Sequence, residues 1–381
     1  MSTYNKTRTL LLLLLSLIFF IFCGFARKRI REPKRVVSIY LTKNIGDVIF
    51  ATPVFRALKE KYPNCHISFI GKPKNKEMLA FNPDIDEYII CPDSPFVLWK
   101  TLRRLNADYA FLFTTSSMEL AFLYVANIPT IGVFSLQNIN RHTISYEILK
   151  RFCVQIPFYS GKNFAIQNLT LLSPLGIHSN NVKKHLYYSP QAEETITHFL
   201  ERSNMRPARD LLVGIAPGAG TKVKQWPAEK FAQLADHIAQ KYSVPLFIVG
   251  GPGDKAEFEE MQAAVSHSTN LISCLDQSID ELKAFVSKID IIIANDSAPI
   301  YIGETFNKAT VVIVGPTDEK EHPPIGVYHR TVVGDKNRKP AMPSMLAVAI
   351  DDKEARKQIE SISVEQVISA VDELIHLLKN K

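Results

Sequence analysis

The chain has 381 residues, with 45 Lys and Arg against 38 Asp and Glu, and a net charge of +7. This length allows about two or three self-sufficient domains, and 46% hydrophobic with 22% charged residues excludes a disordered or collagen-like chain. The excess charge lies in residues 1–35, which hold eight basic side chains and one acidic one. Because the remainder is neutral, the charge does not indicate nucleic-acid binding.

The N-terminal segment has the pattern of a membrane anchor. Residues 10–26 form an uncharged apolar run of 17 residues, about 25 Å long as a helix. Lys6 and Arg8 precede the run, and six basic residues follow it. Positive charge prefers the cytoplasmic side, so the pattern predicts a single-pass anchor at the cytoplasmic face of the inner membrane. A cleaved signal peptide and a buried helix are the alternatives, although the run ends in a poor cleavage sequence.

The five cysteines are widely spaced and never in a CxxC arrangement. They favour neither a disulfide framework nor a zinc site, and we expect no metal centre. Cys65, Cys91 and Cys274 lie in or beside apolar runs, where cysteine is usually a small buried side chain.

Strands and helices alternate from residue 36 onward, which is typical of parallel βαβ units. In the first half the pattern predicts strands at residues 36–42, 66–71, 87–91, 109–113 and 130–134, and helices at 45–62 and 96–105. Residues 136–209 are less regular. Apart from a polar helix at 191–202, we expect acceptor-side loops and an interdomain connection there.

A second α/β series starts after residue 210. Its predicted strands are 211–216, 245–249, 271–273, 289–294 and 310–314, and its predicted helices are 228–241, 254–264, 279–287 and a short one from 299. A last helix is expected at 364–378, with Ser363 and Gln366 as its capping pair. The expected regions are an anchor with its basic flank (1–35), an acceptor-side domain (36–190), a connection (191–209), a donor domain (210–362) and a C-terminal helix (363–381). Two such domains would face a cleft that holds ligands at the carboxyl ends of the strands.

The first candidate site follows the first predicted strand. Lys43, Gly46 and Asp47 lie where this strand leads into a helix. Gly46 lets a ligand approach the backbone, and Asp47 brings a carboxylate to the mouth of the expected cleft. An Asp in the first turn of a helix also stabilises the helix through its dipole, so a purely structural role is the alternative.

A glycine-rich turn opens the second series. Gly218, Ala219, Thr221 and Lys224 lie between a strand and a helix. Backbone N–H groups at a helix start, together with a lysine, form an anion site, so this turn predicts phosphate binding. The turn is neither a P-loop nor a GxGxxG fingerprint, and a plain glycine turn with solvated lysines is the alternative.

Three more polar turns follow strands of the same half. Asp254 ends a Gly-Gly-Pro-Gly-Asp turn, where it either binds a ribose hydroxyl pair or caps a helix. Asp296 and Ser297 follow the most apolar strand and suit a phosphate or a sugar. Residues 315–318 close the next strand at the same edge. With Asp47 on the facing domain, these turns predict a bipartite site for a nucleotide diphosphate.

These ordered motifs resemble glycosyltransferase family 9, the heptosyltransferases. The resemblance spans about residues 36–375 and is carried by Gly46-Asp47 with Pro53, residues 82–87 (NPDIDE), Pro217-Gly218-Ala219, Lys224-Gln225-Trp226-Pro227, residues 250–254 (GGPGD), Asn295-Asp296-Ser297, residues 315–318 (GPTD) and residues 362–367. It implies a GT-B fold of two Rossmann-like parallel-sheet domains. It also implies transfer of heptose from ADP-heptose to a lipopolysaccharide core or similar glycolipid.

The resemblance implies roles for the candidate residues as well. Asp47 would be the base of an inverting displacement, with Lys43 and Gly46 beside it on the acceptor side. Donor-binding roles are implied for Gly218, Ala219, Thr221, Lys224, Asp254, Asp296, Ser297, Ala298 and Tyr301. A lysine and helix N-termini would stabilise the departing diphosphate without a metal or a cofactor. The expected partners are the nucleotide-sugar donor, the glycolipid acceptor and, through residues 10–26, the membrane.

Two positions depart from the family pattern. Ala298 stands where the family usually has Gly, and Tyr301 where it usually has His. A different nucleotide-hexose donor is therefore one alternative, and a non-catalytic nucleotide-sugar-binding protein is another, although Asp47 and Lys224 are both retained. An oxidoreductase is disfavoured because no GxGxxG opens either half.

Overall fold

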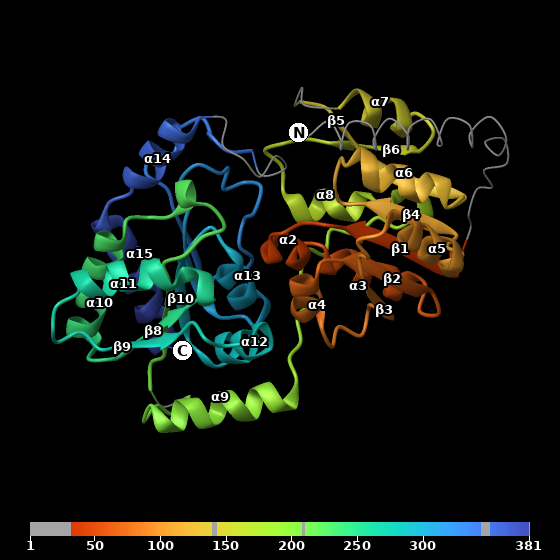
Figure 1. The fold of residues 1–381 in the computed structure, drawn as a ribbon. Coiled ribbons are helices and arrows are strands. Elements are labelled where there is room, and N and C mark those ends of the chain that lie inside the picture. The colour runs from red at the N-terminus through yellow and green to blue at the C-terminus, as the bar shows by residue number, and fades with distance from the viewer. Residues whose placement is uncertain (1–31, 139–142, 208–209, 344–350, 381) are drawn as a thin grey trace. The chain divides into compact units, whose positions relative to one another are not determined.

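The computed structural model describes residues 32–138, 143–207, 210–343 and 351–380. These residues form two compact units, each built on a parallel β-sheet with helices on both faces (Figure 1). The first unit holds residues up to 43, 50–76 and 82–182, and the second holds 44–49, 77–81 and the rest. The expected arrangement of two domains about a cleft stays a prediction.

The predicted anchor at residues 10–26 lies outside the described residues. Within the described ranges, the structure has no helix that is long and apolar enough to cross a membrane.

The first sheet has six parallel strands in the order β3-β2-β1-β4-β5-β6. The strands are β1 (Arg35–Tyr40), β2 (His66–Gly71), β3 (Glu87–Ile90), β4 (Tyr109–Leu112), β5 (Thr130–Leu136) and β6 (Val154–Phe158). The chain leaves β1 toward β2 and leaves β4 toward β5, on opposite sides. The carboxyl ends of β1 and β4 therefore form a topological switch point, where α/β sheets bind ligands.

Helices cover both faces of this sheet. They are α3 (Thr52–Lys61), α4 (Pro73–Leu79), α5 (Pro95–Leu105), α6 (Ser117–Val125), α7 (Ile144–Lys150) and α8 (Phe164–Thr170). On one face α5, α6 and α7 pack on Val37, Ile39 and Leu112 in one buried cluster. On the other face the core is aromatic, and Phe55 of α3 lies edge-on against Phe69 at 5.5 Å between ring centroids.

Two predictions for this half are wrong. The helix expected at 45–62 is split into α2 (Ile45–Ile49) and α3, because Pro53 lacks an N–H and favours the start of a new helix. The loops expected after residue 136 include β6, α7 and α8. The strand β6 contains Pro157 and pairs with β5 at the edge of the sheet, where proline is tolerated.

The second sheet is also six-stranded and parallel, in the order β12-β11-β10-β7-β8-β9. Its strands are β7 (Val213–Ala216), β8 (Leu246–Val249), β9 (Leu271–Cys274), β10 (Ile291–Asn295), β11 (Ala309–Ile313) and β12 (His329–Val332). Its switch point lies at the carboxyl ends of β7 and β10. The strand β12 was not predicted.

The helices of this unit are α9 (Pro190–Arg202), α10 (Ala228–Tyr242), α11 (Lys255–Ala264), α12 (Ile279–Lys288), α13 (Ala298–Thr305), α14 (Asp352–Glu360) and α15 (Val364–Lys379). Short 3-10 turns occur at Lys222–Lys224 and Pro252–Asp254. The expected capping pair of Ser363 and Gln366 is present at the start of α15, and α14 was not predicted.

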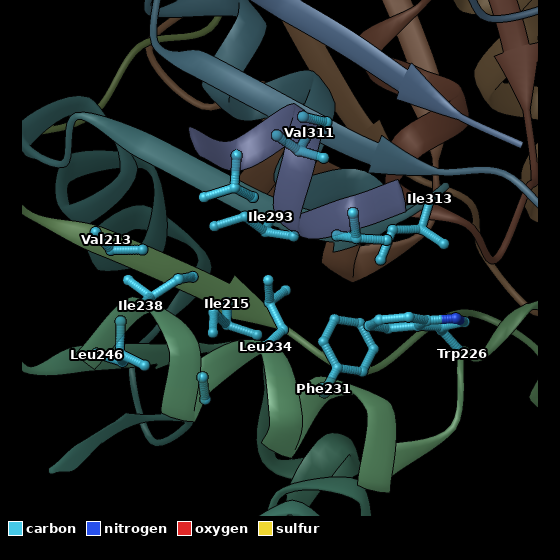
Figure 2. Packing of buried hydrophobic residues seen from close by; sticks show 14 of the residues in the cluster. Val213, Ile215, Trp226, Phe231, Leu234, Ile238, Leu246, Ile293, Val311 and Ile313 are labelled. Atoms are coloured by element: carbon cyan, nitrogen blue, oxygen red, sulfur yellow. The ribbon is translucent and has the colours of Figure 1, made fainter. Parts of the chain in front are cut away.

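The core beside this switch point is built from buried apolar side chains. Figure 2 shows Ile215, Ile293 and Ile313 of neighbouring strands lying over α10, with Trp226 and Phe231 at one end. The two aromatic rings meet edge to face at 5.0 Å between centroids. Trp226 thus anchors the end of the glycine-rich turn in the core, which fixes the residues that precede it.

Candidate active site

The buried amide of Asn295 joins the two strand ends at the second switch point. Its side-chain oxygen accepts a hydrogen bond from the Trp226 backbone N–H at 2.9 Å. Its side-chain nitrogen donates to the carbonyls of Pro217 and Gly218 at 2.7 and 3.3 Å. One side chain at the end of β10 therefore fixes both ends of the 217–226 turn, and we assign it a positioning role.

The same turn is held from its outer side by the C-terminal part of the chain. Arg356 of α14 donates to the backbone carbonyls of Lys222 and Gln225, both at 3.0 Å. The Trp226 indole donates to the carbonyl of Ile362 at 3.0 Å. With its backbone fixed on both sides, the turn presents the Lys224 side chain in one place.

Asp296 is the centre of a buried polar cluster. Its carboxylate forms an ion pair with the Lys224 ammonium at 2.8 Å and accepts a hydrogen bond from the Thr317 hydroxyl at 2.8 Å. It also accepts a hydrogen bond from the Tyr301 hydroxyl. Asp296, Thr317 and Tyr301 are all buried. Two turns that are far apart in the sequence, and the helix α13, thus each supply a partner to one carboxylate.

Electrostatics keep that carboxylate ionised. Burial alone would raise the pKa of Asp296, but the charges of Lys224 and His322, with hydrogen bonds from Lys224 and Tyr301, hold it well below its usual range. For Tyr301, burial and the nearby Asp296 charge raise the pKa of the phenol, so it stays a hydrogen-bond donor. The cluster is a fixed, paired arrangement of charge.

His322 is a member of this cluster that the sequence analysis missed. Its ring lies 6.0 Å from the Tyr301 ring between centroids, and it lines a small pocket with Asp296 and Thr317. Burial lowers the pKa of the His322 imidazole, although the negative charges of Asp296 and Glu321 raise it in part. A lone histidine in a loop without periodicity carries no sequence signal. Only the turn at 315–318 pointed to this region.

Asp254 binds its own turn. Its carboxylate accepts a hydrogen bond from the Gly251 N–H at 2.8 Å. It also approaches the glycine-rich turn so closely that a Cβ added at Gly218 would lie 2.0 Å from a carboxylate oxygen. Gly218 is therefore required for this contact. The predicted ribose contact stays a prediction.

The next polar group of the glycine-rich turn is the Thr221 hydroxyl. Its oxygen is buried, and among the described residues it has no hydrogen-bond partner. A buried hydroxyl without a partner costs free energy. Gly218 and Ala219 precede it in the same turn.

Ser297 and Ala298 mark the start of α13. The Ser297 hydroxyl donates to the carbonyl of Asn295 at 3.2 Å and does not cap the helix. Ala298 is buried, so its methyl group narrows the space at the helix N-terminus relative to glycine. In this first turn Pro299 has no N–H, and the Ile300 N–H donates to the Ser297 carbonyl at 3.2 Å, which limits the donors that α13 can offer an anion.

Asp47 lies on the short helix α2, which belongs with the second unit and packs on α13. The Asn44 amide donates to its carboxylate at 3.2 Å. The negative charge of Asp47 raises the pKa values of both Tyr301 and His322, so Asp47 lies near the Asp296 cluster. A Cβ added at Gly46 would lie 3.6 Å from the Tyr301 ring. Lys43 is exposed and belongs to the first unit.

Glu119 is a second residue that the sequence analysis missed. It lies at the switch point of the first sheet and is 6% exposed. The Thr114 hydroxyl donates to the Glu119 carboxyl group at 2.7 Å. The same carboxyl group also forms a hydrogen bond with the backbone of Leu41, just after β1. Burial raises the pKa of this carboxyl to about 7, against the opposing effect of these hydrogen bonds. A single Glu in an apolar helix carries no sequence signal.

No cluster of His, Cys, Asp and Glu side chains arranged to hold a metal ion occurs in residues 32–138, 143–207, 210–343 and 351–380.

Comparison with known protein families identifies the chain. The model of glycosyltransferase family 9 (heptosyltransferase) matches residues 96–345, which is more than half of the chain and includes the whole Asp296 cluster. The chain belongs to this family. The resemblance of the ordered motifs is thereby confirmed, and the protein is a glycosyltransferase of the heptosyltransferase type.

Curated relatives cover most of the chain. Lipooligosaccharide heptosyltransferase 2 of Haemophilus influenzae is 23% identical over 303 residues, which are 74% of this chain and 83% of the relative. Lipopolysaccharide heptosyltransferase 3 of Escherichia coli K12 is 26% identical over 287 residues, which are 72% and 80% of the two chains.

Solved structures share the fold. A glycosyl transferase of family 9 from Veillonella parvula has a TM-score of 0.74 at 21% identity and covers 90% of this chain and 97% of its own. The Escherichia coli ADP-heptose lipopolysaccharide heptosyltransferase II has a TM-score of 0.71 at 16% identity, covering 91% and 99%. The predicted pair of parallel α/β domains of the GT-B type is confirmed.

Proposed function

We propose that this glycosyltransferase transfers heptose from ADP-heptose to a hydroxyl of a lipopolysaccharide core or similar glycolipid, by an inverting displacement that needs no metal. The observation that carries the proposal is the buried cluster of Lys224, Asp296 and Thr317 at the switch point of the donor sheet. A fixed ammonium at the end of parallel strands is suited to a diphosphate.

Lys224 is the proposed partner of the leaving diphosphate. An ammonium group has three N–H donors, and Asp296 accepts only one of them. The other two point to a phosphate oxygen in the proposed complex, joined by the Thr221 hydroxyl and the N–H groups of the turn. Asp296 orients the lysine, so the cation is in place before charge develops on the leaving group.

Asp47 is the proposed base. The acceptor oxygen attacks the anomeric carbon, its proton passes to the Asp47 carboxylate, and the bond from the anomeric carbon to the β-phosphate oxygen breaks. ADP leaves with the bonding electron pair, and the configuration at the anomeric carbon inverts. The hydrogen bond from Asn44 orients the Asp47 carboxylate, which supports this role.

The relatives support the proposed acceptor, and the N-terminal sequence supports the proposed location. The curated relatives are named as lipooligosaccharide or lipopolysaccharide heptosyltransferases, which supports a glycolipid acceptor. The apolar run at residues 10–26, flanked by basic residues, supports an anchor that holds the enzyme at the cytoplasmic face of the inner membrane.

Calorimetric titration with ADP, UDP, GDP and ADP-heptose in the presence of EDTA tests the donor. Selective binding of the two adenine ligands is the expected result. Preference for UDP or GDP would retain the glycosyltransferase and overturn the heptose assignment. Binding that requires a divalent cation would overturn metal independence.

A different nucleotide-hexose donor is the second candidate, and Tyr301 favours it. Its phenol binds Asp296 within the donor site, in a position where the family usually has an imidazole. Tyr301→His separates the two candidates: a variant that gains affinity for ADP-heptose at the expense of another nucleotide sugar would favour the hexose.

A further inference from the structure

Exposed apolar side chains gather at one edge of the first unit. The helices α5, α6 and α7 each follow a strand of the first sheet, so their first turns all lie at its carboxyl edge. Those first turns carry Phe96 and Val97, Met118, and Ile144, which are 58%, 47%, 42% and 81% exposed. This edge also holds the switch point beside Glu119.

The three helices are neighbours. The helix α6 packs against both α5 and α7, so the three helices form one layer on a single face of the sheet. Figure 1 shows α5, α6 and α7 on the same side of the strands. We name Phe96, Val97, Lys100, Met118 and Ile144 together the α5–α7 rim.

The charge at this edge is basic. The Lys100 ammonium lies 4.5 Å from the centre of the Phe96 ring, and Lys43, Lys72 and Lys74 are exposed after β1 and β2. None of these four lysines forms an ion pair with a described residue. The exposed acid nearest in sequence to the α5 turn is Asp93.

The amino edge of the same sheet is different. There Lys59 forms an ion pair with Asp86 at 2.7 Å and His66 lies 3.8 Å from Glu87, while Arg104 and Arg151 are exposed without an ion pair to a described residue. Val154 at this edge is 39% exposed, less than any of the four apolar side chains of the rim. The more exposed apolar side chains therefore distinguish the carboxyl edge.

We propose that the α5–α7 rim docks the first unit on the surface of an anionic lipid bilayer. Phe96, Val97, Met118 and Ile144 enter the boundary between headgroups and acyl chains, while the lysines bind lipid phosphates. Lys100 keeps its charge at the headgroups while its stem covers the Phe96 ring. The inference rests on the proposed function for one point, that the acceptor is a lipid held in such a surface.

This contact places the acceptor-side switch point against the bilayer. The acceptor hydroxyl of a membrane lipid lies within the headgroup region, so the enzyme reaches it by lying on the surface. An anchor at residues 10–26 would bring the chain to the membrane without setting its orientation. The rim sets the orientation.

Trp99 is a natural reporter of this contact. The chain has two tryptophans, and Trp226 is 2% exposed in the core of the second unit. Trp99 lies under the rim, where its ring stacks on Phe96 at 5.7 Å between centroids and its indole donates to the Val125 carbonyl. Quenching of Trp99 fluorescence by lipids brominated in the acyl chain therefore measures insertion of the α5–α7 rim, even when the N-terminal segment already holds the protein on the vesicle.

The experiment uses the full chain with vesicles of phosphatidylglycerol and phosphatidylethanolamine, and with phosphatidylcholine vesicles for comparison. We expect brominated anionic lipid to quench the emission, and the quenching to vanish in Trp99→Phe. The double variant F96S/I144S should lose the quenching, and Lys100→Glu should weaken it about fivefold at a given lipid concentration. Val154→Ser, at the exposed start of β6 on the amino edge, is the matched control and should change nothing.

Three results would overturn the proposal. One is an unquenched Trp99 on vesicles that bind the protein. Another is equal quenching on neutral and anionic vesicles. The third is a rim variant that changes the sedimentation of the protein in the absence of lipid, which would assign the rim to contact with a second copy. An ADP titration of the same samples distinguishes these failures from a failure of the proposed function.

Discussion

The two switch points carry one buried carboxyl group each, and their surroundings shift the two pKa values in opposite directions. Asp296 in the second unit has the Lys224 ammonium at 2.8 Å, which holds its pKa well below the usual range. Glu119 in the first unit has a hydroxyl and a backbone group as partners, and burial raises its pKa to about 7. Topology sets where the carboxyl lies, and the nearest cation sets its charge.

This difference separates the proposed donor site, with its ionised carboxylate, from the proposed acceptor edge. The Asp296 cluster is paired and held in place by its own hydrogen bonds, which suits the proposed diphosphate binding. The proposed acceptor edge has a buried carboxyl group whose pKa is raised to about 7, together with exposed apolar side chains, which suit an amphiphile. Each prediction below tests one side of this contrast.

The largest expected effect is on turnover. Asp47→Asn should lower kcat by about 10²–10⁴-fold because the acceptor proton loses its base, while ADP affinity stays unchanged. Product formation and calorimetry measure the two quantities. Asp93→Asn, an exposed acid of the first unit, is the control. A D47N variant with normal turnover would remove Asp47 from the chemistry.

The second prediction concerns Glu119 and pH. Since its folded pKa of about 7 exceeds its ordinary value, the native state binds more protons than the unfolded state between those values, and stability falls as pH rises through this window. Glu119→Gln removes the effect. It should raise the free energy of unfolding by about 3 kcal/mol at pH 8 and by little at pH 4.5.

Urea denaturation at several pH values measures this difference. Glu60→Gln, which makes the same chemical change at an exposed position on α3, is the control variant. A constant difference between E119Q and the parent at all pH values would show that Glu119 is ionised in the folded protein, and the contrast with Asp296 would then disappear.

The third prediction removes the cation of the donor site. Lys224→Ala should weaken ADP binding by about 1.5–3 kcal/mol, the range for a hydrogen bond to a charged group. Lys222→Ala changes an exposed lysine of the same turn and should leave the affinity unchanged. Equal losses in the two variants would indicate a general charge effect, in place of a specific contact.

The smallest expected effect concerns the backbone of the turn. Gly218→Ala places a methyl group against the Asp254 carboxylate and should weaken ADP binding by about 1–3 kcal/mol, as overpacking does. Gly253→Ala adds its methyl group in open space and serves as the control. Unchanged ADP binding in G218A would mean that the turn adapts freely and is less fixed than its hydrogen bonds indicate.

The sequence predicted the elements that carry strong local signals. The capping pair of Ser363 and Gln366 located α15, and the polar turns after apolar strands located Asp296 and Lys224. These features depend on residues close together in the chain. Their proposed roles stay predictions until they are measured.

Features that depend on distant partners were missed. The strand β6 forms because it can pair with β5 at the edge of the sheet. Its Pro157 is not typical of a strand, so the local sequence does not indicate one. His322 and Glu119 matter through the groups that surround them, and a single titratable residue shows nothing of its burial in sequence. The interaction of Asn295 with two turns likewise appears only when the strands are assembled.

The outer support of the glycine-rich turn has a consequence for synthesis on the ribosome. Arg356 and Ile362 hold Gln225 and Trp226, which precede them by 131 and 136 residues. A nascent chain folds its early parts first, but its donor turn lacks these supports until α14 has left the exit tunnel. We therefore expect a nascent chain to bind the proposed nucleotide sugar only after α14 and Ile362 have been synthesised, so that shorter nascent chains do not compete with the folded enzyme for it.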